Sequence, residues 1–248
     1  MKKIELKKSE QLVQDSVAAY YEDVRYALPA ARQYYQWFFK KLFSLAQPYG
    51  QILDNGCGNG ILGEFWEGDI VGVDLSAEMA SRARKRLKEV RVGDSQYLPF
   101  ADKSFDTVIS LSLLHHLPDP MKGLDEIVRV LRPGGTAIFE EVVKTSLSAV
   151  PRFFLNRFSS HFSHEHKNFR KFELLSLIGD RLKIQEVRHY GYLAYALLGF
   201  PDIINFQRYL PLKSVTIPLL LSLDDMMEKV PLLKTQSWNI IIIASKPK

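Results

Sequence analysis

The segment ILDNGCGNGILG, residues 52–63, constrains the fold of this chain more than any other stretch. Its apolar beginning is typical of a buried strand, and a turn follows in which Gly56, Gly58 and Gly60 alternate with other residues. Glycine adopts positive φ at little steric cost and lets a ligand approach the backbone closely. A strand, a glycine turn and a helix in this order form the ligand-binding unit of many α/β proteins. We therefore expect this turn to contact a ligand.

The rest of the chain alternates between strand-like and helix-like segments, which predicts a doubly wound α/β fold. We expect a seven-stranded, mostly parallel sheet with an antiparallel last strand and helices on both faces. The predicted strands lie at 51–56, 69–76, 90–94, within 104–117, and at 136–143, 182–193 and 237–246. The predicted helices lie at 10–46 with a break near Pro29, and at 61–67, 77–90, 121–135 and 171–180.

Composition indicates a cytoplasmic protein. The single cysteine, Cys57, excludes an internal disulfide framework and suits a reducing compartment. The N-terminal lysines have no apolar run behind them, so we expect no secretory signal. The longest apolar runs, VTIPLLLSL and IIIIA, are far shorter than the roughly 20 residues that a bilayer-spanning helix needs.

The charge around the glycine turn indicates which ligand it binds. Read literally, residues 58–63 form the G-x-G-x-x-G pattern of dinucleotide sites, whose pyrophosphate requires a site free of nearby anions. Residues 42–81, however, contain no lysine or arginine and six acidic residues, one of which, Asp54, ends the strand. These charges favour a cationic ligand with a ribose and leave Gly63 a packing role. A turn that serves packing alone is the alternative.

Five motifs in order then resemble the class I S-adenosylmethionine-dependent methyltransferases, in particular their small-molecule, type 11-like branch. The motifs are ILDNGCGNG, VGVDLS, VGDSQYLPFADKSFDTVIS, LLHHLPD and VLRPGGTAIFEE, within about residues 48–142. The resemblance implies S-adenosyl-L-methionine as the cofactor. It also implies one domain over 1–248, comprising a helical cap, a cofactor-binding half and two substrate-side insertions, at 1–47, 48–142, 143–172 and 193–236.

The resemblance also implies a role for each residue along the cofactor crevice. Asp54 is expected to act on the ammonium group, directly or through water, and Asp74 to accept the two ribose hydroxyls. Leu75 is expected to pack on the adenine, while Asp94, with Ser95 beside it, accepts from the adenine amine. Backbone near the end of the fourth strand is expected to receive the ammonium end. The cofactor-binding residues are thus Asp54, Gly56, Gly58, Gly60, Asp74, Leu75, Asp94, Ser95 and Leu111, with Ser112 next to the last.

Methyl transfer from a sulfonium mainly requires alignment of two reactants and exclusion of water, but a hydroxyl, amine or carbon nucleophile can also need a base. The candidates for that base are His116 or its neighbour His115, Glu140 or its neighbour Glu141, and His164. His164 belongs to a group with His161, Glu165 and His166, whose spacing matches no common zinc pattern. We therefore expect no metal.

The insertions indicate the kind of acceptor. Segment 146–162 contains four phenylalanines and two arginines, and segment 192–223 consists mostly of Leu, Ile, Phe, Tyr and Pro with few charges. This surplus of apolar residues predicts a small apolar acceptor such as a lipid, a quinone precursor or a polyketide-like molecule. The second insertion could instead be a lid with its own core, a homodimer face or a peripheral membrane contact.

Two other classes of function remain as alternatives. The basic run 81–90 and the lysines at the start of the chain favour an RNA or protein methyltransferase. No basic, aromatic-interleaved groove accompanies them, so we expect no nucleic-acid partner. A non-catalytic protein, in which a cofactor-binding fold serves as a partner or regulatory subunit, is the other alternative.

Overall fold

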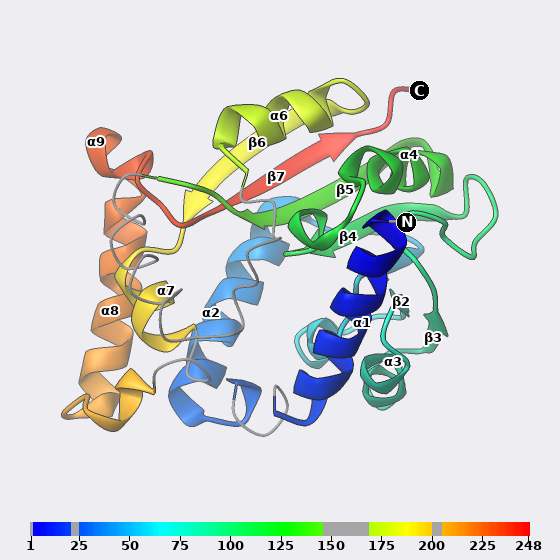
Figure 1. The fold of residues 1–248 in the computed structure, drawn as a ribbon. Coiled ribbons are helices and arrows are strands. Elements are labelled where there is room, and N and C mark those ends of the chain that lie inside the picture. The colour runs from blue at the N-terminus through cyan, green and yellow to red at the C-terminus, as the bar shows by residue number, and fades with distance from the viewer. Residues whose placement is uncertain (1, 21–24, 146–168, 200–204) are drawn as a thin grey trace.

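The computed structural model describes residues 2–20, 25–145, 169–199 and 205–248 of the chain (Figure 1). A single sheet of seven strands has the order β3-β2-β1-β4-β5-β7-β6. Strand β7 runs antiparallel to both β5 and β6, and the other pairs are parallel. This confirms the predicted fold class. The strands are β1 Ile52–Asn55, β2 Ile70–Asp74, β3 Glu89–Val92, β4 Phe105–Leu111, β5 Leu131–Val142, β6 Lys183–Tyr190 and β7 Asn239–Ser245.

Helices cover both faces of the sheet (Figure 1). One face packs against α2, α3, α7 and α8, and the other packs against α4 and α6. The α-helices are α1 Lys2–Tyr20, α2 Pro29–Ala46, α3 Ala77–Ala83, α4 Pro120–Val130, α6 Lys171–Gly179, α7 Leu193–Leu198, α8 Lys213–Met227 and α9 Pro231–Lys234. Short 3₁₀ helices occur at η2 Ile61–Glu64, η3 Leu114–His116 and η4 Phe206–Arg208.

The isoleucine run of β7 shows how the two faces are filled. Side chains alternate along a strand, so Ile240 and Ile242 pack towards α4 and α6 while Ile241 and Ile243 pack towards α2 and α7. A strand buried on both faces is expected to be apolar throughout, as this one is. The sheet order reverses between β1 and β4, and in open α/β sheets the ligand crevice lies at such a point, beyond the carboxyl ends of the strands.

The helix predicted over 77–90 is wrong in its second half. Ser76 caps the helix as its sequence suggests, since its Oγ accepts a hydrogen bond from the Met79 amide at 3.0 Å. The helix ends at Ala83, and Glu89–Val92 pairs with β2 instead. Strand pairing has overridden the helix propensity of the basic residues. Similarly, the helix expected over 121–135 ends at Val130, because β5 begins at Leu131.

The chain between β6 and β7 is mainly helical where it is described. It forms α7, η4, α8 and α9 in place of a tight hairpin, and α7 and α8 pack against each other and against α2. Most of the first predicted insertion, including His161, His164, Glu165 and His166, lies outside the described residues. No helix in the described ranges has the length and hydropathy to cross a membrane.

Candidate functional site

A cavity of about 270 Å³ lies at the carboxyl ends of the central strands, between them and the helices α1 and α2. It is lined both by the residues expected to bind a cofactor and by two of the candidate bases. Those of the predicted set that line it are Asp54, Gly56, Gly58, Asp74, Leu75, Asp94, Ser95, Leu111, His116 and Glu140. The cavity therefore brings together residues that lie in or just after the carboxyl-terminal parts of β1, β2, β3, β4 and β5.

The glycine turn is fastened to β2 and open towards the cavity. The amides of Gly56 and Cys57 donate to the Val73 carbonyl at 2.9 and 3.0 Å. Gly58 has φ +52°, and a Cβ built there would meet nothing within 4 Å. Backbone at Gly58 can thus approach a ligand without obstruction.

The other two glycines of the segment serve packing. A Cβ on Gly60 would lie 2.9 Å from Ala83 Cα, so this position lets the turn approach α3. Gly60 does not line the cavity, in contrast to its expected place beside the ligand. A Cβ on Gly63 would lie 2.6 Å from the Arg86 carbonyl oxygen, which agrees with the packing role expected for Gly63.

Two buried carboxylates flank the turn. Burial raises the pKa of Asp54 to about 7, and the nearby charge of Asp74 adds to the effect. Burial also raises the pKa of Asp74, although two backbone amides oppose this: Gly58 N donates to Asp74 Oδ2 at 2.8 Å and Ser76 N to Oδ1 at 2.9 Å. A cation placed between these two acids would favour the ionised form of both carboxyls and lower their pKa values.

Helix α1 crosses the mouth of the cavity and contacts three strand ends. Lys7 Nζ lies 2.9 Å from Asp94 Oδ2, and Glu10 Oε1 lies 2.9 Å from His116 Nδ1. Ser76 Oγ donates a short hydrogen bond to Asp15. Burial raises the pKa of Asp94, but hydrogen bonds from Lys7 and Gln96 outweigh it, so the net shift is downward. These α1 residues were not predicted as site residues, because contacts between positions so distant along the chain leave no local signal in the sequence.

Glu140 occupies the opposite end of the cavity, among aromatic rings. Its Oε1 accepts a hydrogen bond from the Tyr190 hydroxyl at 2.5 Å, and its Oε2 accepts one from Ser112 Oγ at 2.7 Å. Burial raises the pKa of Glu140 to about 7 despite these two donors. The lining here comes from α2, β6 and α7 and includes Tyr34, Phe38, Tyr190 and Tyr195. None of these aromatic residues was predicted as a site residue.

Ser112 itself has φ +51°, a conformation that non-glycine residues seldom adopt. Its amide donates to the Glu140 carbonyl at 2.7 Å, in addition to the side-chain bond to the same residue. Two bonds to one partner therefore hold this strained residue beside the cavity.

The neighbouring candidates His115 and Glu141 form a structural pair away from the cavity. Glu141 Oε2 lies 2.6 Å from His115 Nδ1, and its Oε1 accepts from the Leu114 amide at 2.6 Å. Burial raises the pKa of Glu141 to about 8. Adjacent residues of a strand point to opposite faces, which explains why Glu140 lines the cavity and Glu141 does not. The described residues contain no group of three or more potential metal ligands.

The basic run 81–90, the basis of the nucleic-acid alternative, is largely paired with acids. Arg82 pairs with Glu78 at 2.9 Å, Arg86 Nε with Glu64 at 2.6 Å, and Lys88 with Asp69 at 2.5 Å. These ion pairs neutralise much of the positive charge that a nucleic-acid surface would need.

Comparisons with known proteins agree with this geometry. Residues 53–139 match the family of methyltransferase domains. An arsenite methyltransferase of Halobacterium salinarum is 34% identical over 121 residues, which cover 43% of this chain and 30% of the relative. A ubiquinone biosynthesis O-methyltransferase of Aliivibrio fischeri is 30% identical over 151 residues, 55% of this chain and 64% of the relative. The chain thus spans less than two thirds of the length of these curated relatives.

Solved structures extend the likeness to nearly the whole fold. An S-adenosylmethionine-dependent methyltransferase of Thermotoga maritima superposes with a TM-score of 0.66 at 20% identity, covering 96% of this chain and 99% of that one. At this identity the likeness shows the fold alone. Residues 53–139 therefore form a domain of the methyltransferase family, and the chain has the fold of the class I methyltransferases, whose cofactor is S-adenosylmethionine.

Proposed function

We propose that this protein transfers the methyl group of S-adenosylmethionine to a small, predominantly apolar acceptor. The observation that carries the proposal is the contrast within one cavity, with buried acids around the glycine turn and aromatic rings around Glu140 beyond them. A cationic cofactor suits the first set, and an apolar molecule suits the second. When bound, the cofactor supplies the electrophilic methyl group on its sulfonium.

The acids would hold the cofactor. Asp74, fixed by two backbone amides, is placed to accept the ribose hydroxyls. Asp54 has a pKa near 7 and is 3% exposed, so a cation beside it would stabilise its ionised form. Asp94 and Ser95 line the part of the cavity after β3, where we assign the adenine.

Glu140 is our candidate for the base. Its pKa of about 7 keeps it in balance between its two protonation states near neutral pH, as proton transfer requires. The hydroxyls of Tyr190 and Ser112 would fix its orientation. His116, which lies against Glu10 of α1, remains a second candidate, and His164 remains an untested one.

The apolar nature of the acceptor rests on the rings of α2, β6 and α7. Tyr34, Phe38, Tyr190 and Tyr195 are each at most 8% exposed and line one side of the cavity. One curated relative acts in ubiquinone biosynthesis, which is consistent with an acceptor of this kind. Because the described lining contains only Lys7 and Arg25 as strongly basic residues, a nucleic-acid acceptor is disfavoured. The single cysteine is the basis on which we propose a cytoplasmic location.

The test is methyl transfer from radiolabelled S-adenosylmethionine into cell extracts, separated into organic-soluble, water-soluble, protein and RNA fractions. We expect label in the organic-soluble fraction. Glu140→Gln should lower the rate about 100-fold while leaving the affinity for S-adenosylhomocysteine within about twofold, because general-base catalysis contributes roughly 10²–10⁴-fold. The exposed Glu89→Gln serves as the matched control.

Label in RNA or protein instead would overturn the apolar acceptor and favour the first alternative. Calorimetry with S-adenosylhomocysteine tests the second alternative, a non-catalytic protein. Absence of binding at millimolar concentration would leave only a non-catalytic role.

A further inference from the structure

We propose that the outer face of α8 is a docking surface for an anionic membrane. The residues concerned are Leu212, Val215, Leu219, Met226 and Val230, which we call the α8 apolar face. Their spacings of three, four, seven and four place them along one side of a helix and its ends. In most soluble proteins such a stripe is buried against the core, but this one is not.

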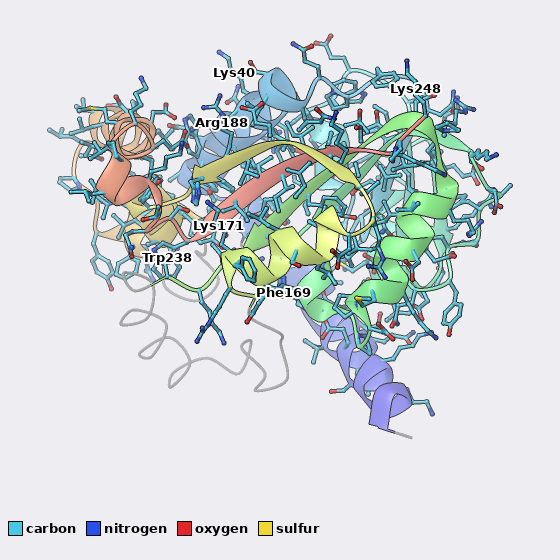
Figure 2. The ribbon with its side chains drawn as sticks, turned by 90° about the horizontal axis from the view of Figure 1, so that it is seen from above. Lys40, Phe169, Lys171, Arg188, Trp238 and Lys248 are labelled. Atoms are coloured by element: carbon cyan, nitrogen blue, oxygen red, sulfur yellow. The ribbon has the colours of Figure 1, made fainter. Side chains whose placement is uncertain are left out.

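The α8 apolar face is strongly exposed. The side chains of Val215, Leu219 and Met226 are 61%, 55% and 59% exposed, and Leu212 is 78% exposed. The opposite side of α8 already packs on α2 and α7 through the buried Ile217, so the helix is oriented and its apolar stripe faces outward. Figure 1 shows α8 at the edge of the molecule beyond β6, and Figure 2 shows the same end from above. Contiguous exposed apolar surface marks an interaction site.

The charges around this face favour an anionic partner. The segment 205–238 has four basic residues, all exposed and without an acidic partner in the described ranges: Arg208, Lys213, Lys229 and Lys234. Lys213 is the first residue of α8 and Lys229 follows its last residue by two positions, so a basic side chain lies at each end of the apolar stripe. An amphipathic helix with apolar residues on one side and basic residues at its borders is typical of helices that lie in the membrane interface.

The acids of the same segment are either buried or paired with α2. Asp224 is fully buried and accepts the amides of Tyr192 and Ala194 at 2.8 and 3.0 Å. Asp225 pairs with Lys41 of α2 at 2.6 Å, and Glu228 forms a short ion pair with the same Lys41. The charge left on the outer surface is therefore basic. Each lysine or arginine near an anionic leaflet contributes roughly 1 kcal/mol to binding.

The same basic border argues against a second copy of this chain as the occupant. Two α8 apolar faces brought together by a two-fold axis would oppose the basic residues of one copy to those of the other, and like charges at an interface are repelled. Anionic lipid headgroups would neutralise them. Exposed Tyr209, at 81%, adds an aromatic side chain of the kind found at membrane interfaces.

Docking here would place the bilayer close to the acceptor end of the cavity. Ile217 on the inner side of α8 packs in the same cluster as Tyr34 and Tyr195, which line that end. The helices α2 and α7, which carry Tyr34 and Tyr195, contact α8 and lie between it and the cavity.

The experiment is co-sedimentation of the full chain with vesicles of phosphatidylcholine alone or with phosphatidylglycerol, in the absence of any acceptor. We expect at least tenfold tighter binding to the anionic vesicles, weakened by salt. Leu219→Glu with Met226→Glu should reduce this binding at least tenfold, and Lys213→Glu with Lys229→Glu should remove the preference for anionic lipid. Because these residues are exposed, the variants should retain cofactor binding and thermal stability.

Two matched controls test the location. Phe172→Glu changes an apolar residue of α6 that is 79% exposed, and Lys85→Glu reverses an exposed charge beyond α3. Both should bind vesicles as the wild type does. Equal loss of binding in the control and α8 variants would overturn the proposal. So would a wild-type dimer in sedimentation analysis that Leu219→Glu dissociates, because the face would then belong to a second copy.

Discussion

The cofactor end of the cavity is built from backbone turns and carboxylates, whereas the acceptor end is built from aromatic rings around a single carboxylate. At the first end Asp54 has no hydrogen-bond donor among the groups that shift its pKa, and only burial and Asp74 act on it. At the second end Glu140 accepts from both Tyr190 and Ser112. Both carboxyls reach a pKa of about 7, yet their surroundings differ.

This difference indicates that burial, which raises the pKa of both carboxyls, serves a different purpose at each end. An unpartnered buried acid gains most from a cation that arrives with the ligand, since the ligand itself supplies the missing partner. A buried acid already held by two hydroxyls has a fixed direction and a pKa near neutrality, which suits proton transfer. The two ends should therefore respond differently to mutation and to pH.

The largest expected effect breaks the cofactor end alone. Asp74→Ala should weaken S-adenosylhomocysteine binding by about 100-fold or more, because a bidentate, charge-assisted hydrogen bond is lost. Isothermal calorimetry checks this, with Asp69→Ala as the control at an exposed ion pair. Retained affinity in Asp74→Ala would contradict the ribose assignment.

A smaller effect should appear in the pH dependence of cofactor binding. The pKa of Asp54 is raised to about 7 in the free protein, so most of it is protonated at pH 6 and most is ionised at pH 8. Binding of a cation favours the ionised form, and affinity should therefore rise roughly tenfold between these values. Asp54→Asn should flatten this profile, whereas Glu140→Gln should leave it in place. A profile equally steep in Asp54→Asn would assign the effect to another group.

The stability of the free protein should have the opposite pH dependence. The folded pKa values of Asp54, Glu140 and Glu141 lie near 7, 7 and 8, above their unfolded values, so the folded state binds more protons. Their contribution is complete below the unfolded pKa and is lost as pH rises through 7 to 8. With the three carboxyls titrating independently, the free energy of unfolding should fall by roughly 5 kcal/mol between pH 6 and 8.5, or on the order of 10–20 °C in Tm. Calorimetric Tm measurements check this, with Glu141→Gln expected to reduce the slope.

The smallest effects should separate the two kinds of glycine. Gly58→Ala adds a Cβ that meets nothing in the free protein, so its cost is about 1 kcal/mol for the positive φ, together with a several-fold loss of cofactor affinity. Gly63→Ala would place a Cβ against the Arg86 carbonyl and should lower Tm without changing the affinity of the folded protein. If Gly63→Ala lowered the affinity for the cofactor and Gly58→Ala did not, Gly63 would be the ligand-contacting glycine and Gly58 the packing one.

The grouping in one cavity of the residues proposed to bind the cofactor was largely predictable, because most of these residues are close together in sequence. Glycines, strand ends and acids occur within residues 52–78, and the absence of basic residues there already excluded a phosphate. The acceptor end was not predictable in detail. Tyr190 and Glu140 are 50 residues apart, and Ser76 and Asp15 are 61 apart, so only the folded chain brings them together. Gly60 shows another limit of prediction from sequence. The alternating glycine motif does not reveal whether a given glycine contacts a ligand or a neighbouring helix.

Helix α1 has a thermodynamic consequence at Asp94. Both oxygens of this carboxylate are engaged in the free protein, one by Lys7 and the other by the Gln96 amide. With the adenine amine assigned to Asp94, the cofactor and Lys7 compete for one acceptor. By linkage, the contact of α1 lowers the affinity for the cofactor by a certain factor, and the bound cofactor weakens that contact by the same factor. The dissociation constant of the cofactor therefore includes the free energy of the contact between α1 and Asp94.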